Sequence, residues 1–139
     1  MLLNEENNIH GTIDPKRPEH LEESVLKYAR TDFPRLNDSL TVDSALRIIR
    51  NEGIGERIVY FYVLDKDEKL IGIVPTRRLL TSMPNVPIAN IMIRDFVSIH
   101  YKSTVLEACE MFVKYKLLAF PVLDDEGRIC GVIDAGLFT

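Results

Sequence analysis

Two stretches of the chain carry nearly the same order of apolar and polar residues. Residues 63–74 read VLDKDEKLIGIV, and residues 122–133 read VLDDEGRICGVI. Each has an apolar run, an acidic turn and a second apolar run that contains a glycine, which is the pattern of two short strands joined by a hairpin turn. The agreement predicts that one structural unit occurs twice in the chain.

A helical pattern precedes each hairpin. The first helix is predicted to begin after Thr41, and the second after Thr104, which opens a Thr-x-x-Glu capping box. Apolar residues then recur at i, i+3, i+4 and i+7 in both copies. They are Val42, Ala45, Leu46 and Ile49 in the first copy, and Val105, Ala108, Cys109 and Phe112 in the second.

The remaining apolar runs predict the strands. A very short strand precedes each helix, and two longer ones follow it, rich in β-branched and aromatic residues. The strands expected are 35–36, Ile58–Leu64 and Leu70–Val74 in the first copy, and 96–99, Ala119–Leu123 and Ile129–Ile133 in the second. A short helix over Pro75–Leu80 closes the first copy, and the first copy is four residues longer near Gly53–Arg57.

These elements divide the chain into segments. Residues 1–17 are polar without periodicity and are expected to be a mobile tail, and residues 18–32 hold an amphipathic leading helix over Pro18–Arg30. The first repeat then covers 33–80, a linker with helical turns near Pro87–Met92 covers 81–95, and the second repeat covers 96–139. The second repeat looks truncated, so we expect the natural protein to continue beyond Thr139.

Composition excludes several classes of protein. The 139 residues are 46% hydrophobic, enough for one modest core or two small fused ones. A net charge of −4 with interleaved signs argues against nucleic acid. No apolar run approaches the ~20 residues of a membrane span. The first six residues, MLLNEE, lack the basic region and apolar core of a signal peptide, so none is expected. Cys109 and Cys130 lie in apolar patterns, as reduced thiols of a cytoplasmic protein do.

Catalytic and metal-binding motifs are absent from the sequence. His10, His20 and His100 show no ligand spacing, and no nucleophile–base motif or phosphate-binding glycine loop occurs. We therefore do not expect an enzyme. The acidic turns 65–68 and 124–126 have the right chemistry for a divalent cation, but solvated hairpin turns carry the same residues.

The repeated pattern resembles a pair of CBS domains. The tandem β-α-β-β-α layout covers about Phe33–Leu80 and Phe96–Thr139, and the strand 60–65 (YFYVLD) is similar to the cytosolic CBS region of MgtE-type magnesium transporters. The resemblance implies an α/β fold of two repeats about a pseudo-twofold axis, preceded by the N-terminal helix. It also implies two clefts for adenine nucleotides (AMP, ADP or ATP), a homodimer formed through helical faces, and no chemistry. Mg²⁺ is a second candidate ligand, and a membrane transport domain is a candidate for the chain beyond Thr139.

In nucleotide-binding members of this family, the last strand is followed by a hydroxyl residue that meets phosphate and, three residues later, by an aspartate that holds the ribose. Pro75 and Arg78 take these positions in the first repeat, and Asp134 and Leu137 take them in the second. Both ribose carboxylates are therefore missing, and Asp134 would repel a phosphate beside it.

The first cleft keeps groups that suit an anion. Thr76, Arg77 and Arg78 supply a hydroxyl and two guanidiniums, which are good phosphate partners, although solvated side chains explain them too. The resemblance places adenine against the short first strand and the start of the second. Those residues are Leu36, Val59, Val97, Ser98, Phe120 and Pro121, each also explained as core.

The sequence leaves two main hypotheses. In the first, the chain is a regulatory CBS pair that senses an adenine nucleotide or a divalent cation for an attached or partner transporter or enzyme. In the second, it is a structural dimerisation module whose clefts are degenerate and empty. An enzyme is a third and weaker option, because nothing supplies a nucleophile with its base.

Overall fold

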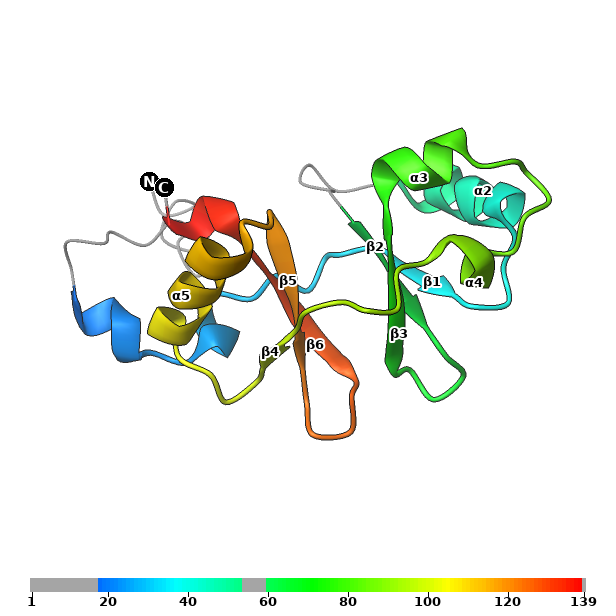
Figure 1. Ribbon diagram of the computed structural model, residues 1–139. Helices are drawn as coiled ribbons and strands as arrows, with labels where there is room; N and C mark the ends of the chain where they lie inside the picture. The colour runs from blue at the N-terminus through cyan, green and yellow to red at the C-terminus, as the bar shows by residue number, and fades with distance from the viewer. Residues whose placement is uncertain (1–17, 54–59, 139) are drawn as a thin grey trace. The chain divides into compact units, whose positions relative to one another are not determined.

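The computed structural model describes residues 18–53 and 60–138 (Figure 1). The described residues form two compact units that do not follow chain order. The first-repeat unit contains residues 32–96 and 126–128, and the second-repeat unit contains residues 18–31, 97–125 and 129–138. The expected tail over residues 1–17 and the insertion after Gly53 lie outside the described residues.

The first-repeat unit is a three-stranded sheet with helices. Its elements are β1 (Arg35–Asn37), α2 (Val42–Glu52), β2 (Tyr60–Leu64), β3 (Leu70–Pro75), α3 (Thr76–Thr81) and α4 (Ile88–Ile91). In the order β1-β2-β3, β1 pairs parallel with β2 and β2 pairs antiparallel with β3. The Thr41 side chain accepts from the Ser44 backbone N–H at the start of α2, and Gly53, at φ +79°, ends the helix.

The second-repeat unit repeats this plan. Its elements are the 3₁₀ turns η2 (Pro18–Glu22) and η3 (Val25–Lys27), β4 (Ile99–His100), α5 (Val105–Tyr115), β5 (Ala119–Leu123), β6 (Ile129–Asp134) and the 3₁₀ turn η4 (Ala135–Phe138). The order β4-β5-β6 has the same parallel and antiparallel pairings as the first sheet. Both sheets shift register at the same place, after Val63 in β2 and after Val122 in β5. The predicted α/β fold of two like repeats is confirmed, with element ends displaced by a few residues.

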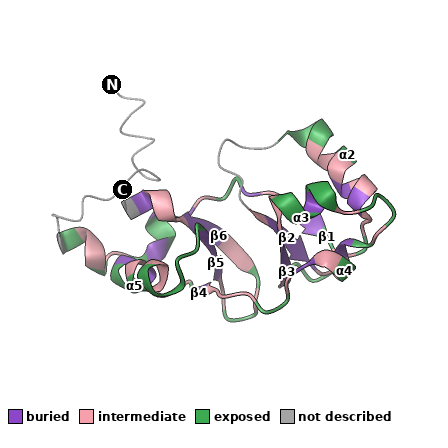
Figure 2. Cartoon of the chain, turned by 45° about the horizontal axis from the view of Figure 1, so that its top comes forward, coloured by how far each residue is buried: buried purple, intermediate pink, exposed green. Residues whose placement is uncertain are grey.

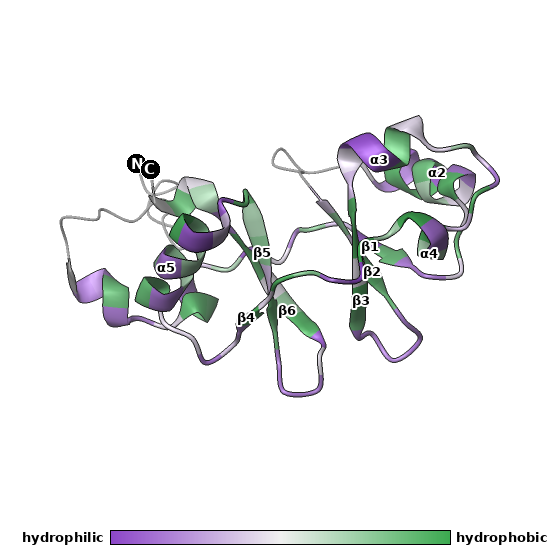
Figure 3. Ribbon diagram, viewed as in Figure 1, coloured by the Kyte–Doolittle hydropathy of each residue, from purple (hydrophilic) through white to green (hydrophobic). Residues whose placement is uncertain are grey.

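Each unit buries its own apolar cluster. The central strands β2 and β5 are almost wholly buried (Figure 2), and the hairpin turns are the hydrophilic ends of the sheets (Figure 3). The clusters contain the helical stripe residues expected from the sequence except Cys109, which is half-buried. Their fully buried members include Val42, Ala45, Val63, Val74 and Ile88 in the first unit, and Val25, Val105, Ala108, Phe120 and Ile133 in the second.

The leading segment is built into the second-repeat unit. Val25 N–H donates to the Ser103 carbonyl at 2.9 Å, and Arg30 exchanges two backbone hydrogen bonds with Val132, at 2.8 and 2.9 Å. The chain before β4 does the same in the first-repeat unit, where Ile93 exchanges two hydrogen bonds with Ile73. Each repeat is thus completed by a segment that lies outside its own β-α-β-β-α pattern.

The leading segment is not the continuous helix that the sequence predicted. Ser24 adopts an extended conformation, with φ −64° and ψ 138°, between η2 and η3, and its side chain accepts from the Leu26 N–H. The extended residues place backbone N–H groups against neighbouring chain segments, where they bond outside the helix. Pairing of the leading segment with the rest of its unit therefore overrides its helical periodicity.

Candidate functional site

The basic group of the first repeat lies directly after β3. Thr76, Arg77 and Arg78 are the first residues of α3, and Pro75 ends β3 opposite Tyr60. Thr76 is half-buried, whereas Arg77 and Arg78 are exposed. The Arg78 guanidinium donates through Nη1 to the Ile91 carbonyl at 2.9 Å. The residues predicted to meet phosphate are therefore close together on one short helix, and its two arginines are accessible to solvent.

The first-repeat residues predicted to contact adenine are Leu36 and Val59, and Leu36 is buried, unlike the exposed arginines of α3. Leu36, in the middle of β1, is only 3% exposed and belongs to the same buried cluster as Leu79. Val59 lies outside the described residues. The geometry of the first-repeat unit thus gives Leu36 a core role.

The corresponding residues of the second-repeat unit are split between core and partly exposed positions. Phe120 is fully buried, with its ring 4.6 Å from that of Phe112 between centroids, and Pro121 is buried opposite Val132. Val97 and Ser98, just before β4, are half-buried. Of these four residues, only Val97 and Ser98 offer partly accessible surface near the short first strand.

Asp134, at the end of β6, is held by an arginine of the leading segment. Its carboxylate accepts hydrogen bonds from Nε and Nη2 of Arg30, the second at 3.2 Å. The Arg30 and Asp134 side chains are 15% and 14% exposed. Leu137, three residues later, is 5% exposed and belongs to the core. The carboxylate predicted to repel phosphate is therefore already paired with a cation.

Arg30 was missed by sequence reasoning, although a signal for it exists. The distance of 63 residues that relates Thr41 to Thr104 also relates Arg30 to Ile93. Ile93 pairs with Ile73 of β3 as Arg30 pairs with Val132 of β6. Extending the repeat comparison upstream would have matched Arg30 with Ile93, and the structure then shows which strand each of them pairs with.

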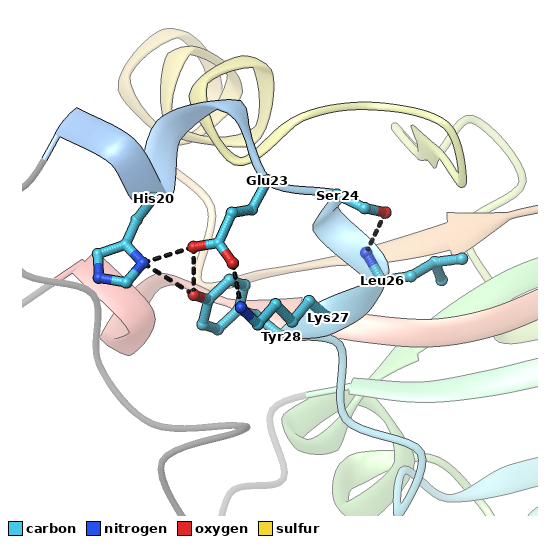
Figure 4. A network of polar contacts seen from close by, with 6 residues as sticks. All are labelled: His20, Glu23, Ser24, Leu26, Lys27 and Tyr28. Atoms are coloured by element: carbon cyan, nitrogen blue, oxygen red, sulfur yellow. Dashed lines mark hydrogen bonds and ion pairs between the residues drawn. The ribbon is translucent and has the colours of Figure 1, made fainter.

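A cluster of polar side chains surrounds Glu23 in the leading segment (Figure 4). Its carboxylate accepts from Tyr28 Oη at 2.8 Å, from His20 Nδ1 at 2.5 Å, and from Lys27 Nζ. The bond from Lys27, followed by those from His20 and Tyr28, lowers the pKa of Glu23 to about 2. Burial, together with the Glu23 carboxylate, raises the pKa of Tyr28 to about 12. These groups link η2 to η3 within the segment that carries Arg30.

The acidic turns use their carboxylates locally. Asp65 accepts backbone N–H bonds from Asp67 and Lys69, at 2.8 and 3.0 Å. Asp125 pairs with His100 Nε2 at 2.7 Å, and this bond lowers the pKa of Asp125. Across residues 18–53 and 60–138, no three histidine, cysteine or acidic side chains are grouped as metal ligands would be. Asp65 thus stabilises its own hairpin turn, whereas Asp125 connects the second turn to His100 of β4.

The family model for the CBS domain matches residues 25–85 and 88–136. The chain belongs to the CBS domain family. Each match begins in the segment that precedes a repeat's first strand, at Val25 or Ile88. Of the helices that the structure describes in this CBS pair, none has the length and apolar character to cross a membrane.

Several curated proteins are similar to this CBS pair. The magnesium transporter MgtE of Thermus thermophilus is 28% identical over 103 residues, which are 73% of this chain and 23% of the transporter. Inosine-5'-monophosphate dehydrogenase of Nitrosopumilus maritimus is 30% identical over 111 residues, 78% of this chain and 23% of the enzyme. The CBS pair therefore spans about a quarter of the length of these relatives.

Solved structures show the same architecture. The cytosolic domain of the Mg²⁺ channel MgtE in complex with ATP superposes with a TM-score of 0.73 at 26% identity, covering 84% of this chain and 47% of that one. The soluble part of a magnesium transporter gives a TM-score of 0.74, also at 26% identity, over 84% and 46% of the two chains. The chain is thus a CBS-pair regulatory module similar to the cytosolic region of MgtE, and modules of this family are regulatory and non-catalytic.

Proposed function

We propose that this CBS pair senses an adenine nucleotide at the basic end of its first repeat and passes the binding energy to an attached or partner protein. The observation that carries the proposal is the exposed pair Arg77 and Arg78 beside Thr76, directly after β3. Guanidiniums and a hydroxyl are the partners that a phosphate group prefers. A CBS structure that is 26% identical was solved in complex with ATP, which supports this class of ligand.

The second repeat contributes less to the proposed nucleotide site. Its carboxylate Asp134 is neutralised by Arg30, so a phosphate there would compete with an ion pair that is largely buried. Leu137 is buried and apolar, and it offers no acceptor for ribose hydroxyls. The expected stoichiometry is therefore one nucleotide for each chain.

Titration calorimetry tests the proposal directly. ATP, ADP and AMP are titrated into the chain with and without Mg²⁺, and Arg78→Ala is compared with Arg50→Ala, an exposed arginine of α2. Loss of one charge-assisted phosphate contact predicts weaker nucleotide binding by about tenfold for Arg78→Ala and no change for Arg50→Ala. Absence of heat with every nucleotide at millimolar concentration would refute the nucleotide-sensor function.

The attached protein is proposed from the relatives. MgtE of Thermus thermophilus supports a magnesium transporter as the regulated domain. A cytoplasmic location for this module is supported by its similarity to the cytosolic domain of MgtE. Mg²⁺ enters the proposal as a companion of the nucleotide phosphates, which it binds in many proteins.

A second candidate function is a structural dimerisation module with empty clefts. The observation in its favour is the outer face of α5, where Leu106 is 43% and Val113 is 72% exposed. The equivalent positions of α2 carry Asp43 and Arg50. Apolar side chains on an exposed helical face favour a contact between two copies, in keeping with the proposed homodimer. A dimeric mass by light scattering without nucleotide heat would favour this function over sensing.

A further inference from the structure

Two arginines of the first-repeat unit donate to the same short helix. Arg78 Nη1 bonds to the Ile91 carbonyl at 2.9 Å, and Arg94 Nη2 bonds to the Ala89 carbonyl at 3.3 Å. These carbonyls are two residues apart in α4, so they are separated by about one half of a helical turn. The backbone of α4 therefore accepts from two guanidiniums that are 16 residues apart in the sequence.

The ion pairs of the described residues do not include these arginines. Within residues 18–53 and 60–138, Arg77, Arg78 and Arg94 form no ion pair with a carboxylate, and Asp95, next to Arg94 in the chain, makes none with it. Elsewhere in the structure, Arg47 is paired with Asp43 at 2.9 Å. Three exposed arginines in and beside α3 and α4, with no described acidic partner, contrast with the net charge of −4 of the chain.

The two guanidiniums also keep donors available. A guanidinium has five N–H donors, and the carbonyl bond of Arg78 or Arg94 occupies only one of its nitrogens. Both side chains are exposed. Each arginine is thus held in position by the backbone and can still donate to an anion, which lowers the entropy cost of binding one.

We propose that Arg94 is a further ligand-binding residue, and that Arg78 and Arg94 together select a polyphosphate over a monophosphate. The inference rests on the proposed nucleotide site and extends it to a residue outside the sequence pattern of α3. A single phosphate can be satisfied by Thr76 and one guanidinium. Further phosphates add charge that the second guanidinium is placed to meet.

A capping role for these arginines makes a different prediction. Basic side chains near a helix C-terminus stabilise its unpaired carbonyls, and α4 ends at Ile91. If Arg94 served only as a cap, its loss would lower the melting temperature and leave the preference among ligands unchanged. The ratio of affinities therefore separates ligand binding from capping.

The test compares Arg94→Gln with the matched variant Arg50→Gln on α2, using ATP, AMP and inorganic tripolyphosphate in calorimetry and thermal unfolding as a check of the fold. We expect Arg94→Gln to lower the affinities for ATP and tripolyphosphate about tenfold. The affinity for AMP should stay within about twofold of that of the unchanged protein. Arg50→Gln should alter none of the three affinities.

The outcomes distinguish the two proposals. Equal weakening of ATP and AMP by Arg94→Gln, or unchanged ATP affinity, overturns the polyphosphate inference while leaving nucleotide sensing in place. Arg94-dependent binding of tripolyphosphate without binding of any adenine nucleotide supports the inference and refutes nucleotide sensing. Failure of the unchanged protein to bind either ATP or tripolyphosphate overturns both.

Discussion

Arg30 and Asp134 form an ion pair that joins the segment before the first repeat to the last strand of the second. The Nη2–Oδ1 distance is 3.2 Å, and backbone hydrogen bonds between Arg30 and Val132 hold the same two segments together. Ile93 and Pro75 occupy the equivalent positions of the first repeat. The two repeats thus share a backbone arrangement, but at these equivalent positions the second-repeat unit has an ion pair and the first-repeat unit has two uncharged residues.

Removal of Arg30 is expected to destabilise the chain. Arg30→Met leaves the Asp134 carboxylate, which is 14% exposed, without its cation, and we expect a loss of about 2–3 kcal/mol in the free energy of unfolding. Urea denaturation at neutral pH measures the loss.

The double variant Arg30→Met/Asp134→Leu is the control for this prediction. Replacing both charges by apolar groups removes the uncompensated carboxylate, so the double variant should be more stable than Arg30→Met. A double variant that loses the sum of the two single losses would show that the pair is not coupled.

Gly131 allows the leading segment to approach β6. A Cβ at this position would lie 2.7 Å from the Ala29 Cβ and 3.0 Å from the Arg30 carbonyl oxygen. Gly131→Ala should therefore displace the backbone of the leading segment and cost about 2–3 kcal/mol in the free energy of unfolding.

Gly72→Ala is the matched variant in the first repeat. Its new methyl group would meet the Met92 side chain, with Sδ at 2.5 Å, Cγ at 2.6 Å and Cβ at 2.9 Å. Because Sδ and Cγ can move when the methionine repacks, only the contact with Cβ persists, and we expect a smaller loss than for Gly131→Ala. A larger loss for Gly72→Ala in urea denaturation would contradict this explanation.

The scaffold was predictable from the sequence because each of its signals is local. The stripe that begins at Val42, the turn at Asp65 and the glycine strand around Gly72 recur in register after Val105. Periodicity and capping then determine the helices and strands, and the structure confirms them. The basic end at Thr76–Arg78 was also visible as a sequence feature, and its role as a ligand site stays a prediction.

The parts that could not be predicted depend on contacts that form only once the chain has folded. The helical spacing of Leu21, Val25 and Tyr28 indicated a helix, but pairing of Arg30 with Val132 competes with intrahelical hydrogen bonds. Arg94 lay in a segment interpreted as a linker, and its bond to the Ala89 carbonyl arises only once α4 has formed. Local patterns contain no information about either contact.

The outer face of α5 is expected to mediate the proposed homodimer. Leu106→Lys/Val113→Lys places two charges where two copies would bury apolar surface, so the variant should be monomeric by light scattering at tens of micromolar. Asp43→Lys on α2, at the position equivalent to Leu106, is the control and should keep the mass of the unchanged protein. If only Asp43→Lys abolished the dimer, the contact between the two copies would lie on α2 and not on α5.

Acid should lower the stability of the folded chain by protonating Glu23. The pKa of this carboxyl is about 2 in the folded chain, against an ordinary 4.5, because Lys27, His20 and Tyr28 bond to it. A lowered folded pKa contributes stability above pH 4.5 that disappears as the pH falls toward 2. Glu23→Gln should be less stable than the unchanged protein at neutral pH, and the difference in urea denaturation should shrink on acidification. A difference that stays constant down to about pH 3 would contradict this assignment.

Alkali should act on the same cluster through Tyr28. Its pKa is raised from 10.0 to about 12 by burial and by the Glu23 carboxylate, so the folded chain holds a proton that the unfolded chain releases. A raised folded pKa gives a contribution that is complete below pH 10.0 and is lost as the pH rises toward 12. Tyr28→Phe removes this part of the pH dependence, and the ultraviolet absorbance of tyrosinate should lose a transition near pH 12. Tyr115→Phe, which removes a tyrosine from α5, is the control and should leave that transition in place. An undiminished transition near pH 12 in Tyr28→Phe would assign it to another tyrosine and remove Tyr28 from the alkaline response.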